Sequence, residues 1–144
     1  MEVYMIIGYT SGVYDLFHIG HLNLLKNAKS MCDKLIVGVT TDNLSQYKNK
    51  IPIIPFEDRL EIVRSIKYVD AVVPQDTMNK YDMCKKLKAN VLFVGDDWYE
   101  TEKWNQIEDD LKILDVRIVY FPYTRGVSTT TIRETLELKR GMKP

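Results

Sequence analysis

The stretch from Thr10 to Leu25 decides the fold and reads T-S-G-V-Y-D-L-F-H-I-G-H-L-N-L-L. An apolar run from Val3 to Tyr9 precedes it and has the length and side-chain branching of a buried strand. Gly12 then permits a turn that a Cβ atom would hinder. The leucines after His21 indicate a helix with one apolar face. This order predicts an anion-binding site, because the first N–H groups of a helix point at the ligand.

The two histidines of the chain both fall at this predicted junction, as His18 and His21. Their imidazoles can donate hydrogen bonds to phosphate oxygens and can offset charge that develops there. Gly20 stands between them and lets the backbone come close to whatever they face. The alternative is that one histidine is a satisfied core residue and the other is solvated. The strand-to-helix position of both favours a phosphate site.

The composition limits the class of protein. The chain has 144 residues and equal numbers of basic and acidic side chains, 20 of each, so its formal net charge is zero. We therefore expect one domain over residues 1–144 and no affinity for nucleic acid. Cys32 and Cys84 have no metal or redox spacing and are expected to be reduced, buried thiols. With no signal-peptide pattern and no apolar run of membrane-spanning length, we expect a cytoplasmic protein that does not bind membranes.

Strand and helix patterns alternate along the chain, which predicts a doubly wound, Rossmann-like α/β fold with a five-stranded parallel sheet. The predicted strands are Val3–Tyr9, Lys34–Thr40, Val69–Val73, Val91–Val94 and Arg117–Phe121. The predicted helices follow His21 and then cover Phe56–Ser65, Tyr81–Leu87, Lys103–Leu114 and Ile132 to about Lys139. Asp42 is a candidate helix N-cap. The prolines at 52 and 55 exclude regular structure and predict a loop that includes residues 48–55.

Further candidate site residues lie beyond the ends of predicted strands. Lys48 and Lys50 stand on the proline-flanked loop, where lysines are either simply solvated or placed over phosphates. Arg59 lies near a helix start, where a cation opposes the helix dipole unless an anion is nearby. The segment 95–98 reads G-D-D-W, a glycine turn with two carboxylates and an indole. Ligands bind at the C-terminal edge of an open parallel sheet, so these groups can gather there.

A run of hydroxyl side chains precedes the last predicted helix. Residues 122–131 read P-Y-T-R-G-V-S-T-T-T. Hydroxyls at a helix start are partly ordinary capping. Four in succession, from Ser128 to Thr131, exceed what a cap needs. Together with the backbone N–H groups they can hold a polyphosphate tail.

These motifs resemble those of the cytidylyltransferases in the H-x-G-H nucleotidyltransferase superfamily, typified by bacterial glycerol-3-phosphate cytidylyltransferase. The family segment G-x-F-D-x-x-H-x-G-H is paralleled by residues 12–21, its G-D-D-W by residues 95–98, and its R-T-E-G-I-S-T-T by residues 123–130. The letters H-I-G-H also occur in class I aminoacyl-tRNA synthetases, which need a far longer chain. The departures from the family pattern are Val13, Tyr123 and Arg125, where the family has threonine, arginine and glutamate.

The resemblance implies that a phosphomonoester oxygen attacks the α-phosphorus of CTP and that pyrophosphate leaves. It implies catalytic roles for His18, His21 and Lys50. The implied nucleotide contacts are Gly12, Val13, Tyr14, His18, His21, Lys50, Asp97, Tyr123, Thr124, Arg125, Gly126, Val127, Ser128, Thr129 and Thr130. The implied substrate contacts are Asp15, Lys48, Arg59, Tyr81 (where the family has a lysine, with Lys80 adjacent), Asp96 and Trp98. Mg²⁺ or another divalent cation would bridge the triphosphate oxygens, with Asp15 or Asp97 as a candidate ligand.

The implied partners are CTP and a phosphorylated small alcohol, glycerol 3-phosphate first among them, with the chain pairing as a homodimer. One alternative is an adenylyltransferase of the same fold that uses ATP on a sugar or flavin phosphate, which Val13 and Tyr123 keep open. A more remote alternative is a non-catalytic nucleotide-binding domain, against which the presence of both histidines argues. Arg125 either supplies the charge that Tyr123 lacks or is a solvated loop residue.

Overall fold

The structure is a computed structural model that describes residues 4–47, 51–95, 101–122, 124 and 126–141. In this part of the chain, five parallel strands form one sheet in the order β3-β2-β1-β4-β5. The strands are β1 (Ile7–Gly12), β2 (Lys34–Thr40), β3 (Ala71–Gln75), β4 (Val91–Gly95) and β5 (Arg117–Phe121). The helices are α1 (Ile19–Ser30), α2 (Asp42–Tyr47), α3 (Phe56–Arg64), α4 (Lys80–Leu87), α5 (Glu102–Lys112) and α6 (Thr129–Gly141).

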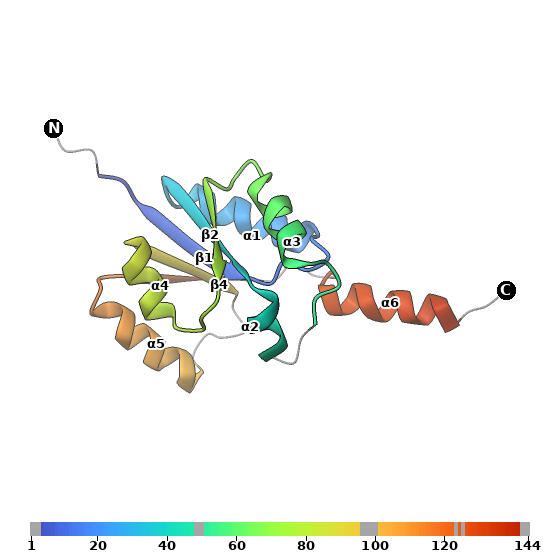
Figure 1. Cartoon of the computed structure of the whole chain (residues 1–144). Helices are drawn as coiled ribbons and strands as arrows, with labels where there is room; N and C mark the ends of the chain where they lie inside the picture. Colours follow the sequence, from blue (N-terminus) through green and yellow to red (C-terminus); the bar gives the residue numbers. More distant parts are fainter. Residues whose placement is uncertain (1–3, 48–50, 96–100, 123, 125, 142–144) are drawn as a thin grey trace.

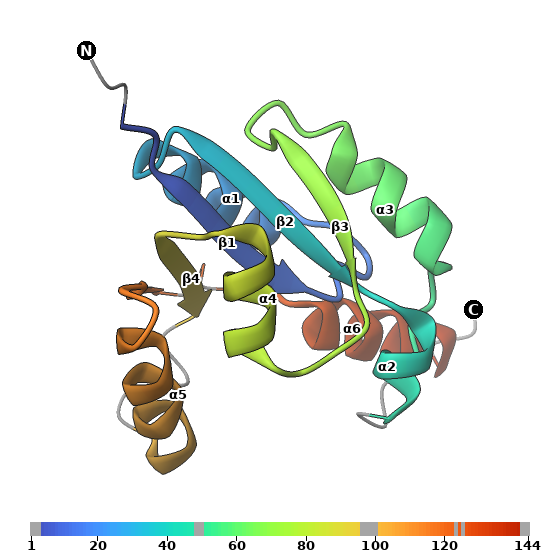
Figure 2. The same ribbon diagram turned by 60° about the vertical axis from the view of Figure 1, so that its left-hand side comes forward.

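Helices cover both faces of the sheet, which confirms the predicted doubly wound fold (Figures 1 and 2). On one face α1 and α3 contribute Leu25 and Val63 to a buried cluster. On the other face α4 and α5 contribute Met83 and Trp104 to a second cluster. The chain runs outward from β1 to β3 and then returns to the other side of β1 as β4. The carboxyl ends of β1 and β4 therefore flank the point where the strand order reverses, which is where ligands bind in such sheets.

Three strands differ in their bounds from the sequence prediction, β4 only in that it runs one residue further, to Gly95. β1 begins at Ile7 rather than Val3, and the Tyr4 and Met5 side chains that precede it are exposed. β3 does not end at Val73 but runs through Pro74 to Gln75. It is an edge strand, and there the N–H group that proline lacks costs no hydrogen bond to a neighbour.

The short helix α2 was not predicted, and the prediction of Asp42 as a helix N-cap is wrong. Asp42 lies inside the first turn of α2, and the Leu44 N–H donates to the hydroxyl of Thr41 at 3.3 Å instead. The Asp42 carboxylate accepts from the guanidinium of Arg59 at 2.6 Å and from the backbone N–H of Phe56 at 3.3 Å. Asp42 therefore joins α2 to α3.

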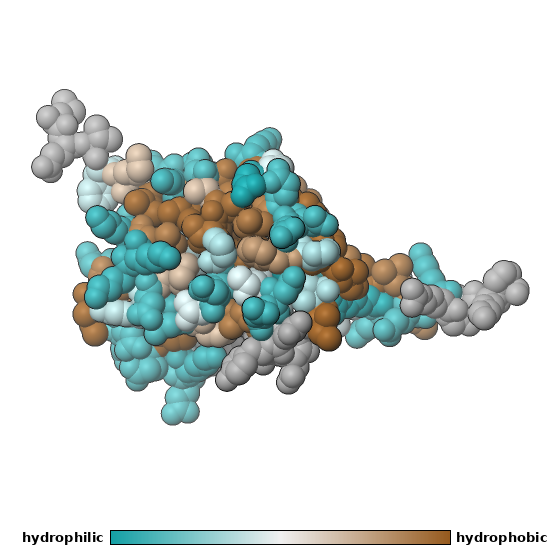
Figure 3. Space-filling model, in the orientation of Figure 1, coloured by the Kyte–Doolittle hydropathy of each residue, from teal (hydrophilic) through white to brown (hydrophobic). Residues whose placement is uncertain are grey.

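The last helix begins at Thr129, three residues before the predicted start at Ile132, so Thr129–Thr131 lie in its first turn and the Ser128 hydroxyl accepts from the Thr131 N–H at 2.9 Å. α6 stands out from the body of the molecule and carries both hydrophilic and hydrophobic residues (Figures 1 and 3). Its Leu136 and Leu138 side chains are exposed. Among the described helices, none combines the length and the apolar character that crossing a membrane requires.

Candidate active site

The loop between β1 and α1 carries both histidines to the C-terminal edge of the sheet. Two of its residues, Tyr14 and Leu16, have φ angles of 56° and 50°. This left-handed backbone is uncommon for residues other than glycine. Such a conformation persists only where surrounding contacts determine it, and it occurs disproportionately at functional sites. Here Tyr14 is buried, so the loop is anchored by its own aromatic ring.

His18 and His21 cap the first turn of α1 for each other. The backbone N–H of Gly20 donates to His18 Nδ1 at 3.0 Å, and the backbone N–H of His18 donates to His21 Nδ1 at 3.2 Å. The two rings stack with their centroids 3.9 Å apart. Because each Nδ1 accepts a hydrogen bond, each neutral ring carries its proton on Nε2. The capping geometry therefore leaves an Nε2–H on each ring as a donor for a ligand oxygen.

Gly20 makes this arrangement sterically possible. A Cβ atom on Gly20 would lie 2.8 Å from Cε1 and 3.0 Å from Nδ1 of His18. Real Cβ atoms essentially never come as close as the first of these contacts. The close approach that the sequence suggested at this glycine is thus made by the imidazole of His18.

Both imidazoles are neutral near pH 7 in the unliganded protein. Burial, and then the neighbouring His18, lower the pKa of His21 to about 4, and the charge of Asp15 opposes this only weakly. Burial also lowers the pKa of His18. A neutral imidazole at a phosphate site acts as a hydrogen-bond donor, so the pair is suited to stabilising charge on phosphoryl oxygens.

Three cavities meet at the histidines, and Tyr14 and His21 line all of them. The first, of about 470 Å³, lies between α1, the end of β5 and the start of α6, and its lining includes Asn23, Asn27, Thr124 and Ser128. The second, of about 260 Å³, lies at the ends of β1 and β4, and its lining includes Ser11, Lys80, Lys103 and Trp104. The third, of about 380 Å³, is lined by Val13, Asp15, Pro52, Thr129, Thr130 and Arg133 together with the two shared residues. The first has the volume of a small-molecule site.

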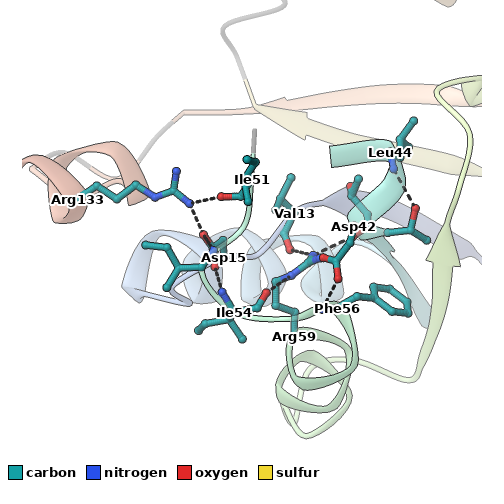
Figure 4. Close-up of polar contacts among 12 residues, drawn as sticks. Val13, Asp15, Asp42, Leu44, Ile51, Ile54, Phe56, Arg59 and Arg133 are labelled. Atoms are coloured by element: carbon teal, nitrogen blue, oxygen red, sulfur yellow. Dashed lines mark hydrogen bonds and ion pairs between the residues drawn. The ribbon is translucent and has the colours of Figure 1, made fainter. Parts of the chain in front are cut away.

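Asp15, in the loop after β1, forms hydrogen bonds both to the segment before α3 and to α6 (Figure 4). Its side chain is 4 % exposed, and its carboxylate accepts from the backbone N–H groups of Ile53 and Ile54, each at 2.9 Å. The same carboxylate accepts from the guanidinium of Arg133 in α6 at 2.5 Å. Burial raises the pKa of Asp15, but these three donors outweigh it and hold the pKa below its usual value. Asp15 is therefore ionised and fully engaged by protein donors.

Arg59 also links segments that are distant in the sequence (Figure 4). Its side chain is completely buried, and the guanidinium donates to the backbone carbonyls of Ile54, Val13 and Thr40 at 2.7–2.9 Å. It also pairs with the carboxylate of Asp42. Arg59 therefore holds the loop after β1, the end of β2 and the start of α3 in one arrangement.

Comparison with known proteins identifies the family. Residues 9–135 match the family model described as Cytidylyltransferase-like. The chain belongs to this cytidylyltransferase-like family.

The cytidylyltransferase-like chain has relatives that carry different enzyme names. Glycerol-3-phosphate cytidylyltransferase of Staphylococcus aureus is 37% identical over 128 residues, which cover 88% of this chain and 92% of the relative. FAD synthase of Pyrococcus abyssi is 37% identical over 116 residues, which cover 78% of this chain and 77% of the relative. The crystal structure of a lipopolysaccharide core biosynthesis protein from Thermoplasma volcanium superposes with a TM-score of 0.71 at 24% identity, covering 84% of this chain and 98% of that one. This last likeness concerns the fold alone.

The cytidylyltransferase-like site brings together most of the described residues that the sequence singled out. The lining of the 470 Å³ cavity includes Tyr14, His18, His21, Thr124, Val127, Ser128 and Thr129. Gly12 and Val13 line the second cavity, and Thr130 lines the third. Gly126 has a φ of 81°, a left-handed backbone conformation in the loop before α6 that glycine adopts without strain. The predicted residues Lys48, Lys50, Asp96, Asp97, Trp98, Tyr123 and Arg125 lie outside the described residues.

Three predicted substrate contacts have other surroundings in this structure. The anion near Arg59 is the Asp42 carboxylate, and the rest of its buried guanidinium donates to backbone carbonyls. The Asp15 carboxylate accepts from the backbone N–H groups of Ile53 and Ile54 and from Arg133. Tyr81 does not line the cavity at the strand ends, whereas the adjacent Lys80 does, with its Nζ 2.7 Å from the Ser11 hydroxyl.

Three further residues were missed by the sequence reasoning. Asn23 lines the 470 Å³ cavity and donates to the Thr124 hydroxyl at 3.0 Å, which links α1 to the loop before α6. Asn27 follows four residues later on the same helix face and lines the same cavity. Arg133 lies just beyond the hydroxyl run and binds Asp15. Asn23 and Asn27 follow Gly20 by three and seven residues, a helical spacing that could have indicated them only if the cavity side of α1 had been known.

No group of three or more potential metal-binding side chains occurs among residues that the structure describes. Mg²⁺ commonly keeps several waters and binds through one or two carboxylates plus substrate phosphates. An ion bound in that way would need few ligands from the protein itself. Asp97, a candidate ligand, lies outside the described residues.

Proposed function

We propose that this protein transfers CMP from CTP to a small phosphorylated alcohol, with glycerol 3-phosphate as the foremost acceptor, and releases pyrophosphate. The observation that carries the proposal is the position of His21, which lines three cavities at once with its Nδ1 fixed by the His18 backbone N–H. A donor placed between cavities can contact a phosphorus atom that is passed from one bound molecule to another. The similarity to named glycerol-3-phosphate cytidylyltransferases supports the choice of reaction.

In the proposed reaction an oxygen of the acceptor phosphate attacks the α-phosphorus of CTP. A new P–O bond forms, the bond from the α-phosphorus to the bridging oxygen breaks, and pyrophosphate leaves with the electron pair. The Nε2–H groups of His18 and His21 donate to the oxygens of the α-phosphoryl group, where charge changes in the transition state. Little covalent chemistry is asked of the protein, since positioning and charge stabilisation provide the catalysis of phosphoryl transfer.

The nucleotide is placed in the 470 Å³ cavity between α1, β5 and α6, with its β- and γ-phosphates at the first turn of α6. There the hydroxyls of Ser128, Thr129 and Thr130 accompany the backbone N–H groups of a helix N-terminus, which favours anions. A bound Mg²⁺ ion would neutralise part of the triphosphate charge. Lys50 over the nucleotide phosphates and Lys48 at the acceptor phosphate remain predictions.

The acceptor is placed in the smaller cavity at the ends of β1 and β4. The ammonium group of Lys80 beside the Ser11 hydroxyl offers it a cation and a hydroxyl. Lys103 lines the same cavity. A volume of about 260 Å³ suits a short polyol phosphate better than a flavin.

The second candidate is adenylyl transfer from ATP to a sugar or flavin phosphate by the same site. It is favoured by the 37% identity to FAD synthase of Pyrococcus abyssi. It is also consistent with Val13 and Tyr123, where the sequence departs from the cytidylyltransferase pattern.

The two candidates are separated by measuring pyrophosphate release with each of the four nucleoside triphosphates. The acceptor panel contains glycerol 3-phosphate, phosphocholine, phosphoethanolamine, a sugar 1-phosphate and FMN, with His18→Ala as the control for contaminating activity. We expect turnover with CTP and a small phosphorylated alcohol that the variant loses. Turnover with ATP and FMN alone would replace the first candidate by the second.

A further inference from the structure

Helix α6 is tied to the rest of the protein by few polar contacts. Within the described ranges, its side chains donate to only two residues outside it. The Thr129 hydroxyl donates to the backbone carbonyl of Asp15 at 2.8 Å. The Arg133 guanidinium donates to the Asp15 carboxylate at 2.5 Å and to the Ile51 carbonyl at 3.1 Å. All these contacts lie in the first five residues of the helix.

Apolar packing does not replace these contacts farther along the helix. Leu136 and Leu138 are 52% and 66% exposed, and α6 stands away from the sheet (Figures 1 and 3). Ile132 is half-buried at the base of the helix. The orientation of the first turn of α6 therefore depends largely on residue 15 and on the contacts that reach it.

The Asp15 residue that accepts these hydrogen bonds is itself held in place by other parts of the protein. The Asp15 carboxylate is 4% exposed and is held by the backbone N–H groups of Ile53 and Ile54. It lies two residues after Val13, whose carbonyl is fixed by the buried Arg59 (Figure 4). Arg133 thus reaches from a projecting helix to a fixed point three residues before His18.

We infer that Arg133 is a positioning residue that orients the N-terminus of α6 toward the histidine pair through the Asp15 carboxylate. Thr129, Thr130 and Arg133 line the same cavity as His21, so a rotation of α6 would move the hydroxyls relative to the imidazoles. Arg133 acts on the phosphate site by holding the helix, and the guanidinium itself does not bind the phosphates. The inference rests on the proposed function only in taking the ligand of this helix to be a polyphosphate.

The test compares Arg133→Gln with Lys139→Gln, which also removes one positive charge from α6 but at an exposed side chain. Arg133→Lys is the conservative variant. Hydrogen exchange is measured in the unliganded proteins over residues 129–136. We expect exchange to be about tenfold faster or more in Arg133→Gln, unchanged in Lys139→Gln and intermediate in Arg133→Lys. Equal exchange in Arg133→Gln and the parent would overturn the inference.

Binding of inorganic tripolyphosphate, followed by calorimetry, is the second readout. We expect its Kd to rise about tenfold in Arg133→Gln, as expected when the binding-competent orientation becomes a minor state. A weaker Kd without faster exchange would mean direct phosphate contact and would also overturn the inference. Neither readout needs turnover. If the parent fails to use CTP while both shifts occur, the proposed function fails and the role of Arg133 stands.

Discussion

Replacing Gly20 by Ala separates the geometry of the histidine pair from the stability of the fold. The added Cβ would lie 2.8 Å from His18 Cε1 and 3.0 Å from His18 Nδ1, so the imidazole has to leave its present place. Leaving breaks the hydrogen bond from the Gly20 N–H to Nδ1 and the stacking on His21. His18 then loses both the contact that fixes its tautomer and its alignment with the site.

The expected sizes of the two effects differ greatly. Losing one preorganised donor to a transition-state oxygen costs about 10²–10³ in kcat. The lost hydrogen bond is worth only about 1 kcal/mol of stability. Ala is favoured over Gly inside a helix by up to about 1 kcal/mol, which offsets that loss. Gly20→Ala should therefore lower kcat by about 100-fold or more and leave the free energy of unfolding within about 1 kcal/mol of the parent.

The assay is steady-state pyrophosphate release with CTP and the preferred acceptor, alongside urea unfolding. His18→Ala and the double variant His18→Ala/Gly20→Ala complete a cycle. If the glycine acts only through His18, the double variant should be no slower than His18→Ala alone. A kcat of Gly20→Ala within threefold of the parent would refute this reasoning. A double variant whose loss of kcat is the product of the losses in the two single variants would also refute it.

Four further predictions concern other parts of the molecule. Arg59→Met should lower the free energy of unfolding by about 3 kcal/mol or more in urea, because three buried carbonyls lose their donor; Arg64→Met, which breaks an exposed pair on the same helix, should change it by less than about 1 kcal/mol. His21 has an ordinary pKa near 6.5 in the unfolded chain and about 4 in the folded protein. The free energy of unfolding should therefore fall as the pH is lowered from 6.5 to 4, by up to about 1.4 kcal/mol per pH unit, and it should fall less in His21→Gln. Arg125→Ala should weaken the use of CTP about tenfold if that guanidinium binds phosphate, and kinetics within twofold of the parent would show that it does not. Light scattering at micromolar concentration should give the mass of a homodimer, and a monomeric mass would count against that prediction.

The sequence predicted the fold wherever a pattern was local. Lys34–Thr40 and Arg117–Phe121 are strands with the predicted bounds, because continuous apolar runs of that length form buried parallel strands. The predicted strand Val69–Val73 ends before Pro74, as it would in the centre of a sheet, but sheet order places β3 at the edge, where the strand runs through Pro74. Sheet order is a tertiary property that no local pattern encodes.

The histidine site was predicted for the same local reason, whereas the hydrogen bonds and ion pairs of Asp15 and Arg59 around it were not. His18 and Gly20 act within one turn of helix, so their spacing carries the geometry. The anion expected near Arg59 is the Asp42 carboxylate, which no local pattern identified because Asp42 and the carbonyls of Val13 and Thr40 are distant in the sequence. Arg133 was missed because its partner Asp15 lies 118 residues away. A charged residue reveals its role only when the fold shows which group it faces.

The central claim is that the phosphate of the acceptor attacks the α-phosphorus of CTP. It is tested by incubating the protein with CTP, Mg²⁺ and glycerol 3-phosphate in which the three non-bridging phosphate oxygens are ¹⁸O, and then analysing the products by mass spectrometry. The account predicts a CDP-linked alcohol that keeps all three labels, with an equal amount of unlabelled pyrophosphate. Formation of CMP without a CDP-linked product, or of label in the pyrophosphate, would contradict it.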